Sequence, residues 1–192
     1  QPVLDFRLHI PPDAPPLPEP LPGARYALLA PTSRWPAKRW PADRFRRLAE
    51  ALLGQGAVDA VAVVGGPGEH NQCAPLADLA ARDRRVVDLV GQTSVGGLMR
   101  LVQSAAVVIA NDSAALHIAV GFDRPIVALY GPTDVNKVGP YGRAADVLQK
   151  LAPGDDLNHK RPENVRLMER VGVEEVLDAA IARAQAPQIP DR

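Results

Sequence analysis

Short apolar runs alternate with amphipathic stretches along most of the chain, and this alternation is the main structural signal in the sequence. The runs that predict β-strands are residues 26–30, 58–66, 86–90, 106–112, 125–131 and 146–149. Most of them lack regular polar alternation, which is typical of strands that are buried on both faces of a sheet. The pattern therefore predicts a sheet that is covered by helices on both sides.

Helical spacing separates the predicted strands, with helices expected at 41–54, 74–82, 94–105, 113–121 and 173–184. Ser94 is placed to cap the third of them. The first presents an apolar face of Phe45, Leu48, Ala49, Leu52 and Leu53, and the last a face of Val173, Val176, Leu177, Ala180 and Ile181. Strands that alternate with helices imply right-handed crossovers, so the predicted fold class is α/β with a doubly wound, Rossmann-like parallel sheet.

Proline marks the start of the chain as different from the rest. Residues 1–22 contain eight of the twenty prolines, a composition that suits neither a helix nor a central strand. We therefore expect an extended interdomain linker at 1–22, a Rossmann-like domain at 23–186 and a tail at 187–192. The sequence does not begin with Met, so the linker is expected to join this domain to a preceding part of the protein.

Composition narrows the possible partners. The 192 residues are 46% hydrophobic and 23% charged, and their 22 basic and 22 acidic residues balance. With no net positive charge and few aromatic residues, nucleic-acid binding is disfavoured. Cys73 is the single cysteine and is expected to be a small buried residue of a cytoplasmic protein. No apolar run approaches the roughly 18 residues of a membrane-spanning helix.

Ligands of doubly wound sheets bind beyond the carboxyl ends of the strands, so the residues that follow each strand are the candidate site. After the first strand, two hydroxyls and three cations lie on one loop: Thr32, Ser33, Arg34, Lys38 and Arg39. Hydroxyls and cations of this kind bind a diphosphate. The alternative is a solvated basic loop that is held to the domain by its tryptophans.

The second and third strands give weaker signals. The sequence GGPGE after the second strand allows close approach of the backbone, and Glu69 could accept hydrogen bonds from ribose hydroxyls or belong to a plain turn. Thr93 precedes the Ser94 cap, where a simple capping turn is the favoured interpretation. Neither the G-x-G-x-x-G fingerprint nor a Walker loop is present in the sequence.

The fourth strand is followed by Asp112, Ser113, Ala114 and His117. Asp112 or Ser113 is predicted to cap the next helix, whose small first turn and partial positive charge would attract phosphate. His117 lies one turn further, either packed in the core or facing the site. A hydrolase triad is disfavoured because Ser113 is not in a G-x-S-x-G elbow, and the four histidines do not have metal-ligand spacing.

Several motifs together resemble a known family. They are TSRWPAKRWP, VVGGPGE, NDSAALHIAVGFDRPIVALYGPTD with the following VGPYGR, and LMERVGVEEVLDAAIA, in that order between residues 24 and 184. In combination they are similar to the donor-binding half of glycosyltransferase family 9, the ADP-heptose:lipopolysaccharide heptosyltransferases. The resemblance implies one half of a GT-B fold, with the acceptor-binding half and the catalytic carboxylate elsewhere.

The resemblance also implies roles for individual residues. Thr32, Ser33 and Lys38 match the loop that binds the diphosphate. Glu69 matches the carboxylate near the ribose, and Thr93 matches a position that contacts the adenosine. The motif that faces the sugar and phosphates is matched by Asp112, Ser113, Ala114 and His117. Two departures stand out: the loop before Lys38 is one residue longer than in some members, and Ala114 replaces a common glycine.

The implied activity is a metal-independent, inverting transfer of heptose from an ADP-sugar donor to a lipopolysaccharide core acceptor. No metal or other cofactor is expected, and no catalytic base lies in this chain; Lys38 would stabilise the leaving ADP. The implied location is cytoplasmic, at the inner face of the inner membrane, where a lipid-linked acceptor is available. Two alternatives stay open: a stand-alone nucleotide-sugar binding module, and another GT-B enzyme such as a UDP-sugar 2-epimerase.

Overall fold

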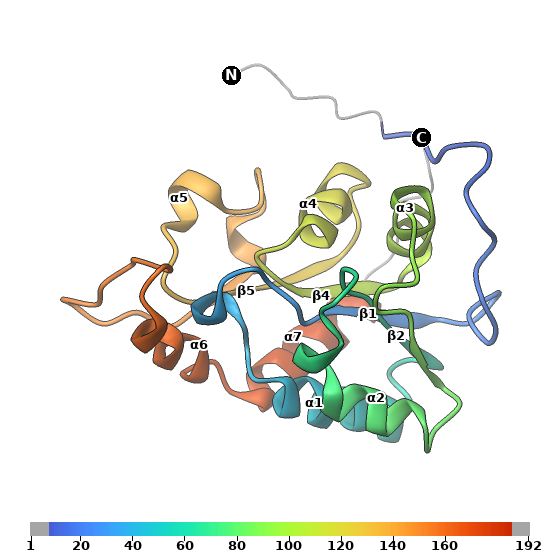
Figure 1. Cartoon of the computed structure of the whole chain (residues 1–192), viewed down its shortest axis with the longest axis horizontal. Coiled ribbons are helices and arrows are strands. Elements are labelled where there is room, and N and C mark those ends of the chain that lie inside the picture. Colours follow the sequence, from blue (N-terminus) through green and yellow to red (C-terminus); the bar gives the residue numbers. More distant parts are fainter. Residues whose placement is uncertain (1–7, 186–192) are drawn as a thin grey trace.

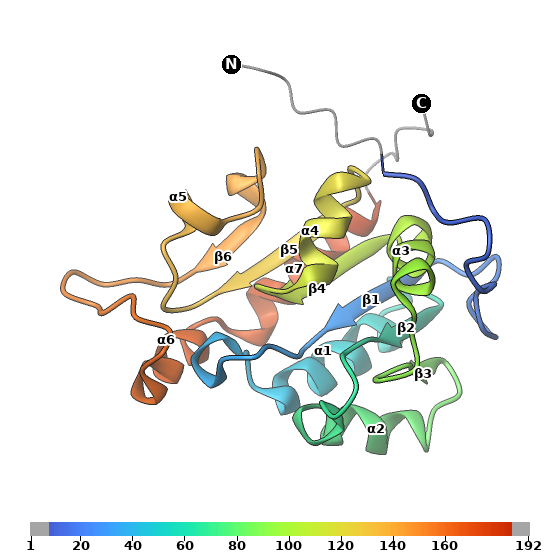
Figure 2. The ribbon, with the colours of Figure 1, turned by 45° about the horizontal axis from the view of Figure 1, so that its top comes forward.

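The computed structural model describes residues 8–185 as an α/β domain built on one six-stranded sheet. Every strand pair is parallel, and the strand order is β3-β2-β1-β4-β5-β6. The strands are β1 (Tyr26–Ala30), β2 (Ala60–Val63), β3 (Val86–Asp88), β4 (Val107–Asn111), β5 (Ile126–Tyr130) and β6 (Val147–Gln149). Figure 2 shows this order from one edge of the sheet to the other. The predicted doubly wound parallel sheet is confirmed.

Helices cover both faces of the sheet (Figure 1). The α-helices are α1 (Ala42–Gly54), α2 (Ala74–Ala80), α3 (Val95–Ser104), α4 (Ala114–Gly121), α5 (Val135–Val138), α6 (Arg166–Glu169) and α7 (Val173–Gln185). Short 3-10 helices lie at Pro36–Lys38, His70–Gln72, Ala144–Asp146 and Pro162–Val165. Among residues 8–185, no helix is both long enough and apolar enough to cross a membrane.

Two hydrophobic cores form, one on each face, because alternate strand residues point in opposite directions. One core joins α1, α2 and α7 to residues such as Leu29 and Ile109, and the other joins α3 and α4 to residues such as Leu28 and Val108. The five apolar residues predicted on the face of α1 are all buried. On α7, Ala184 is buried and Ile181 only partly buried.

The proline-rich segment lies against the domain over its described part. Residues 8–22 contain neither helix nor strand, as predicted, but Leu21 is 1% exposed and belongs to the core with α3 and α4. A side chain built at Gly96 would come within 3.1 Å of Ala14, so the missing side chain lets the segment pack on α3. Its function as a linker stays a prediction, and residues 1–7 and the tail at 187–192 lie outside the described residues.

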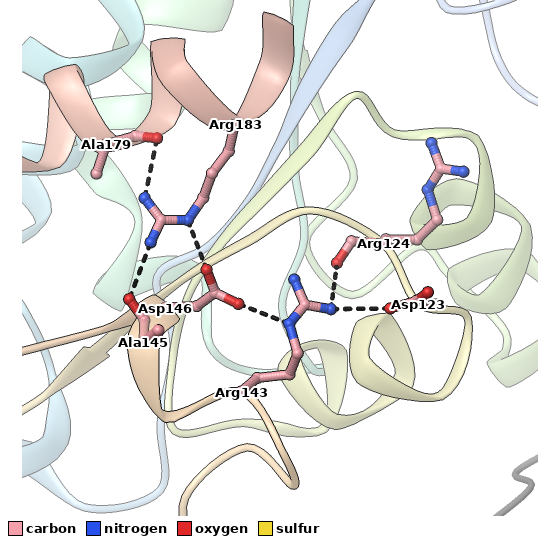
Figure 3. Close-up of polar contacts among 7 residues, drawn as sticks. All are labelled: Asp123, Arg124, Arg143, Ala145, Asp146, Ala179 and Arg183. Carbon is pink, nitrogen blue, oxygen red and sulfur yellow. Dashed lines mark hydrogen bonds and ion pairs between the residues drawn. The ribbon is translucent and has the colours of Figure 1, made fainter. Parts of the chain in front are cut away.

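A network of charged side chains ties α7 to the opposite end of the sheet from the predicted site (Figure 3). The carboxylate of Asp146 accepts hydrogen bonds from Arg143 Nε at 2.6 Å and Arg183 Nε at 2.9 Å. Arg143 also reaches Asp123, in the turn between α4 and β5, at 3.1 Å. The Asp146 side chain is 18% exposed, whereas that of Asp123 is 78% exposed. Asp146 is therefore the central acceptor of this network.

Substitution Asp146→Asn should lower the free energy of unfolding by about 1–2 kcal/mol, because two partly shielded guanidinium groups lose their shared charge. The matched change Asp123→Asn removes an exposed ion pair and should change it by less than about 0.5 kcal/mol. Urea unfolding followed by circular dichroism measures both. Equal effects of the two substitutions would contradict the central position of Asp146.

Candidate functional site

Two adjoining cavities open beyond the carboxyl ends of the strands, where the predicted fold class places a ligand. The first has a volume of about 480 Å³ and is formed by segments that follow β1, β2, β3 and β4. Of the predicted site residues, it contains Thr32, Ser33, Lys38, Glu69, Thr93, Asp112, Ser113 and Ala114. The structure therefore brings eight predicted residues from four separate loops to one cavity.

The second cavity has a volume of about 590 Å³ and lies beyond β4 and β5. His117, the ninth predicted residue, lines this cavity instead of the first. Lys38 and Asp112 line both cavities. A ligand bound at these two side chains can therefore extend into either cavity.

Lys38 and Asp112 form an ion pair between the two cavities. Lys38 Nζ donates to Asp112 Oδ2 at 2.5 Å, and the two side chains are 14% and 13% exposed. His117 Nε2 lies 3.6 Å from the other carboxylate oxygen of Asp112. Burial raises the pKa of Asp112, but the contacts with His117 and Lys38 outweigh burial, so this pKa lies below its usual range. Asp112 is therefore a carboxylate at neutral pH.

The predicted side-chain cap of α4 is wrong. Ser113 occupies the N-cap position in an extended conformation, but its hydroxyl makes no capping hydrogen bond and is buried without a partner. Asp112 turns to Lys38 and His117 instead of the helix. The first N–H groups of α4 are thus left without a side-chain acceptor, and the positive end of the helix remains available to an anion.

His117 does not pack in the core. It is half exposed, and its ring faces Asp112 across the start of α4. The alternative of a core histidine, which the sequence left open, is therefore wrong.

Buried polar contacts hold the loop that carries Lys38. Asn111, at the end of β4, is fully buried; it accepts from Trp40 N at 3.1 Å and donates to Pro31 O at 2.6 Å. These bonds clamp both ends of the loop to β4. Arg39 Nε donates to Ser33 O at 2.7 Å, so Arg39 supports the loop backbone. Of the three loop cations, Arg34 and Lys38 line the first cavity.

The loop after β2 closes another side of the first cavity. Glu69 accepts a hydrogen bond from Gly66 N at 2.6 Å, which fixes its carboxylate at the cavity wall. A side chain built at Gly65 would lie 2.8 Å from Thr32, so glycine permits the close approach of these loops. After β3, Ser94 accepts from Gly97 N at 3.1 Å, which confirms the predicted cap of α3. Thr93 stands just before this cap, in the cavity lining.

Sequence reasoning missed several lining residues. The first cavity has apolar walls of Trp35, Val64, Val95 and Leu98, and the second also contains Thr133, Asp134, Lys137 and His159. The turn with Thr133 directly follows a predicted strand, so it could have been included among the residues that follow the strands. His159 comes from a late loop that precedes α6, and no local signal connects it with the site.

The lining residues indicate which chemical groups of a ligand each part of the site can bind. Lys38 and the start of α4 suit an anion such as phosphate, while the apolar walls of the first cavity suit a flat ring. Seven of the ten residues that line the second cavity have polar side chains, and these can hydrogen-bond a ligand rich in hydroxyls. In residues 8–185, no group of three or more His, Cys, Asp or Glu residues is placed to hold a metal ion.

Comparison with known proteins decides the family. A model described as glycosyltransferase family 9 (heptosyltransferase) matches residues 14–165. The chain belongs to glycosyltransferase family 9. The resemblance seen in the motifs is thereby confirmed, and with it the association with lipopolysaccharide core heptosyltransferases.

Relatives and solved structures agree with this placement. Lipooligosaccharide heptosyltransferase 2 of Haemophilus influenzae is 32% identical over 132 residues, which are 68% of this chain and 35% of that protein. The structure of E. coli ADP-heptose LPS heptosyltransferase II matches with a TM-score of 0.71 and 25% identity, over 84% of this chain and 46% of that one. E. coli heptosyltransferase WaaC with ADP matches with a TM-score of 0.58 and 25% identity, over 83% of this chain and 46% of that one.

The family 9 chain therefore corresponds to one half of a GT-B heptosyltransferase structure. It spans about half the length of those solved structures, and the aligned part covers about a third of the curated relatives.

In this family 9 chain, Asp112→Asn should lower the free energy of unfolding by about 1–2 kcal/mol at neutral pH, because the partly buried Lys38 loses its counter-charge. The pKa of Asp112 is lowered by folding, so its contribution is present above the unfolded-state value of about 4 and is lost as the pH falls. The difference in the free energy of unfolding between wild type and Asp112→Asn should therefore become smaller as the pH is lowered from 6 to 3.

Urea unfolding at several pH values tests this prediction, with exposed Asp78→Asn as the control. A gap between wild type and Asp112→Asn that is constant over this range would show that the Asp112 charge does not stabilise the fold.

Proposed function

We propose that this chain is the donor-binding half of a metal-independent, inverting glycosyltransferase that transfers heptose from an ADP-sugar to a lipopolysaccharide core acceptor. The observation that carries the proposal is the position of Lys38. It stands beside the start of α4 and lines both cavities, so a diphosphate held there has room on each side. A nucleotide sugar has this shape, with a nucleoside and a sugar on opposite sides of its diphosphate.

The first cavity fits the nucleoside. Its apolar walls, which include Val95 and Leu98 of α3, can cover an adenine ring. Glu69 is held in place by its hydrogen bond from Gly66 N and can accept hydrogen bonds from ribose hydroxyls. Thr93 lines the same cavity just before the N-terminus of α3. E. coli WaaC, a relative of known structure, is described with ADP, which supports adenine as the base.

The diphosphate fits between the cavities. Lys38 supplies a full positive charge, and the first N–H groups of α4 supply a partial one. Thr32 and Ser33 add hydroxyl donors from the same loop. The sugar then extends into the second cavity, where Asp112 and His117 can contact its hydroxyls.

These positions support a leaving-group function in the transfer. An acceptor hydroxyl oxygen bonds to the anomeric carbon of the sugar, and the bond from that carbon to the phosphate oxygen breaks. The electron pair leaves with ADP, whose growing negative charge Lys38 and the α4 terminus would stabilise. The proton of the acceptor hydroxyl passes to a carboxylate in the acceptor-binding half, which we place outside this chain. Transfer to a lipid-linked acceptor would take place at the cytoplasmic face of the inner membrane.

Calorimetry with ADP tests the donor site. Wild type should bind ADP in the presence of a chelator, and Lys38→Ala should weaken binding by about 1.5–3 kcal/mol, or roughly 10- to 150-fold, because a charged hydrogen bond is lost. Lys150→Ala is the matched control, since Lys150 pairs with Glu175 and lines neither cavity. Its ADP affinity should equal that of wild type.

Three results would contradict the proposal. They are no ADP binding at millimolar concentration, binding only after Mg²⁺ is added, and equal affinity of wild type and Lys38→Ala. Tighter binding of UDP than of ADP would instead favour a UDP-sugar enzyme.

A further inference from the structure

His159 lies on a loop that none of the sequence motifs includes. It lines the second cavity together with His117 and Lys38. The two histidines come from separate parts of the chain, one from α4 and the other from the loop between β6 and α6. The folded chain therefore adds a second imidazole to the cavity in which the proposed function places the sugar.

The loop fixes the position of His159. Asn164 is 2% exposed, and its side-chain nitrogen donates to Asn158 O at 2.9 Å and to Asp156 Oδ2 at 3.2 Å. Asn158 in turn accepts from Lys160 N at 3.0 Å. The buried Asn164 amide thus holds the residue before His159, and the side chain of Asn158 holds the residue after it. Such support lowers the conformational entropy that the side chain loses when it binds a ligand.

Trp35 holds the ring itself. The indole of Trp35 and the imidazole of His159 meet edge to face, with their centroids 5.5 Å apart. Trp35 lines the first cavity and His159 the second, so this ring pair forms part of the wall between them. Within residues 8–185, the His159 ring has this aromatic contact but no hydrogen bond or ion pair. Its nitrogens are therefore available to a ligand.

The charge around the ring favours its neutral form. Burial lowers the pKa of His159, as do the positive charges of Lys38 and Lys160, while Asp112 offsets part of this effect. At pH 7 the ring therefore has one N–H donor and one nitrogen acceptor. This combination suits a hydroxyl group, which can both accept and donate, better than it suits a phosphate.

We propose that His159 is a specificity-determining residue that hydrogen-bonds a hydroxyl of the donor sugar. The inference rests on the proposed donor function, because that function places the diphosphate at Lys38 and the sugar in the second cavity. Trp35 and the Asn164-braced loop act as positioning groups for the ring. Recognition of the sugar then depends on a residue that is remote in sequence from the phosphate-binding segments.

Calorimetry with two ligands, ADP and ADP-heptose, tests the inference on the full chain. His159→Ala should leave the Kd for ADP within about twofold of wild type, because ADP does not reach the second cavity. The Kd for ADP-heptose should rise about 3- to 10-fold, the loss expected for one neutral hydrogen bond. His159→Gln, which keeps a donor and an acceptor, should recover part of this loss. His9→Ala, an exposed histidine that lines neither cavity, is the control.

The outcomes separate this inference from the proposed function. An unchanged Kd for ADP-heptose in His159→Ala would overturn the assignment of His159, as would equal weakening of both ligands, which would indicate a purely structural effect on the Lys38 loop. Equal affinity of wild type for ADP and ADP-heptose would show that the sugar makes no net favourable contact, and would also overturn it. Failure of wild type to bind ADP at all would instead refute the donor function.

Discussion

The ion pair between Lys38 and Asp112 is the interaction on which the site depends. It joins the loop after β1 to the start of α4, and it stands where the two cavities meet. The buried Asn111 sets its geometry by clamping the ends of the Lys38 loop to β4. Because both charges are largely shielded from solvent, each stabilises the other in the absence of ligand. A bound diphosphate would give Lys38 a second partner and leave Asp112 available to the sugar.

This arrangement also explains why the helix cap is missing. An Asp or Ser at the start of a helix usually accepts from its first N–H groups. Here Asp112 is directed to Lys38 and His117, and the Ser113 hydroxyl has no partner. The helix start thereby loses a stabilising contact that is worth about 1 kcal/mol in other proteins. The same loss leaves an anion site at the point where the proposed transfer needs one.

The strands and main helices were predictable from sequence because their signals are local. Apolar periodicity identified the buried face of α1, and the residues that follow the predicted strands include most of the polar residues of the first cavity. Side-chain partners were not predictable, since they depend on which loops meet in space. The cap of α4 was predicted from residue type, but a lysine 74 positions away in the chain competes for Asp112. His159 was missed for the same reason, because only folding brings its loop to Trp35.

The central claim is that one donor molecule lies across both cavities, with its diphosphate at Lys38. The most direct measurement is a crystal structure of the chain with ADP-heptose. The account predicts adenosine in the first cavity, phosphate oxygens within hydrogen-bond distance of Lys38 Nζ and the first N–H groups of α4, and the sugar in the second cavity. A complex in which the diphosphate avoids Lys38, or in which the sugar lies outside the second cavity, would contradict it.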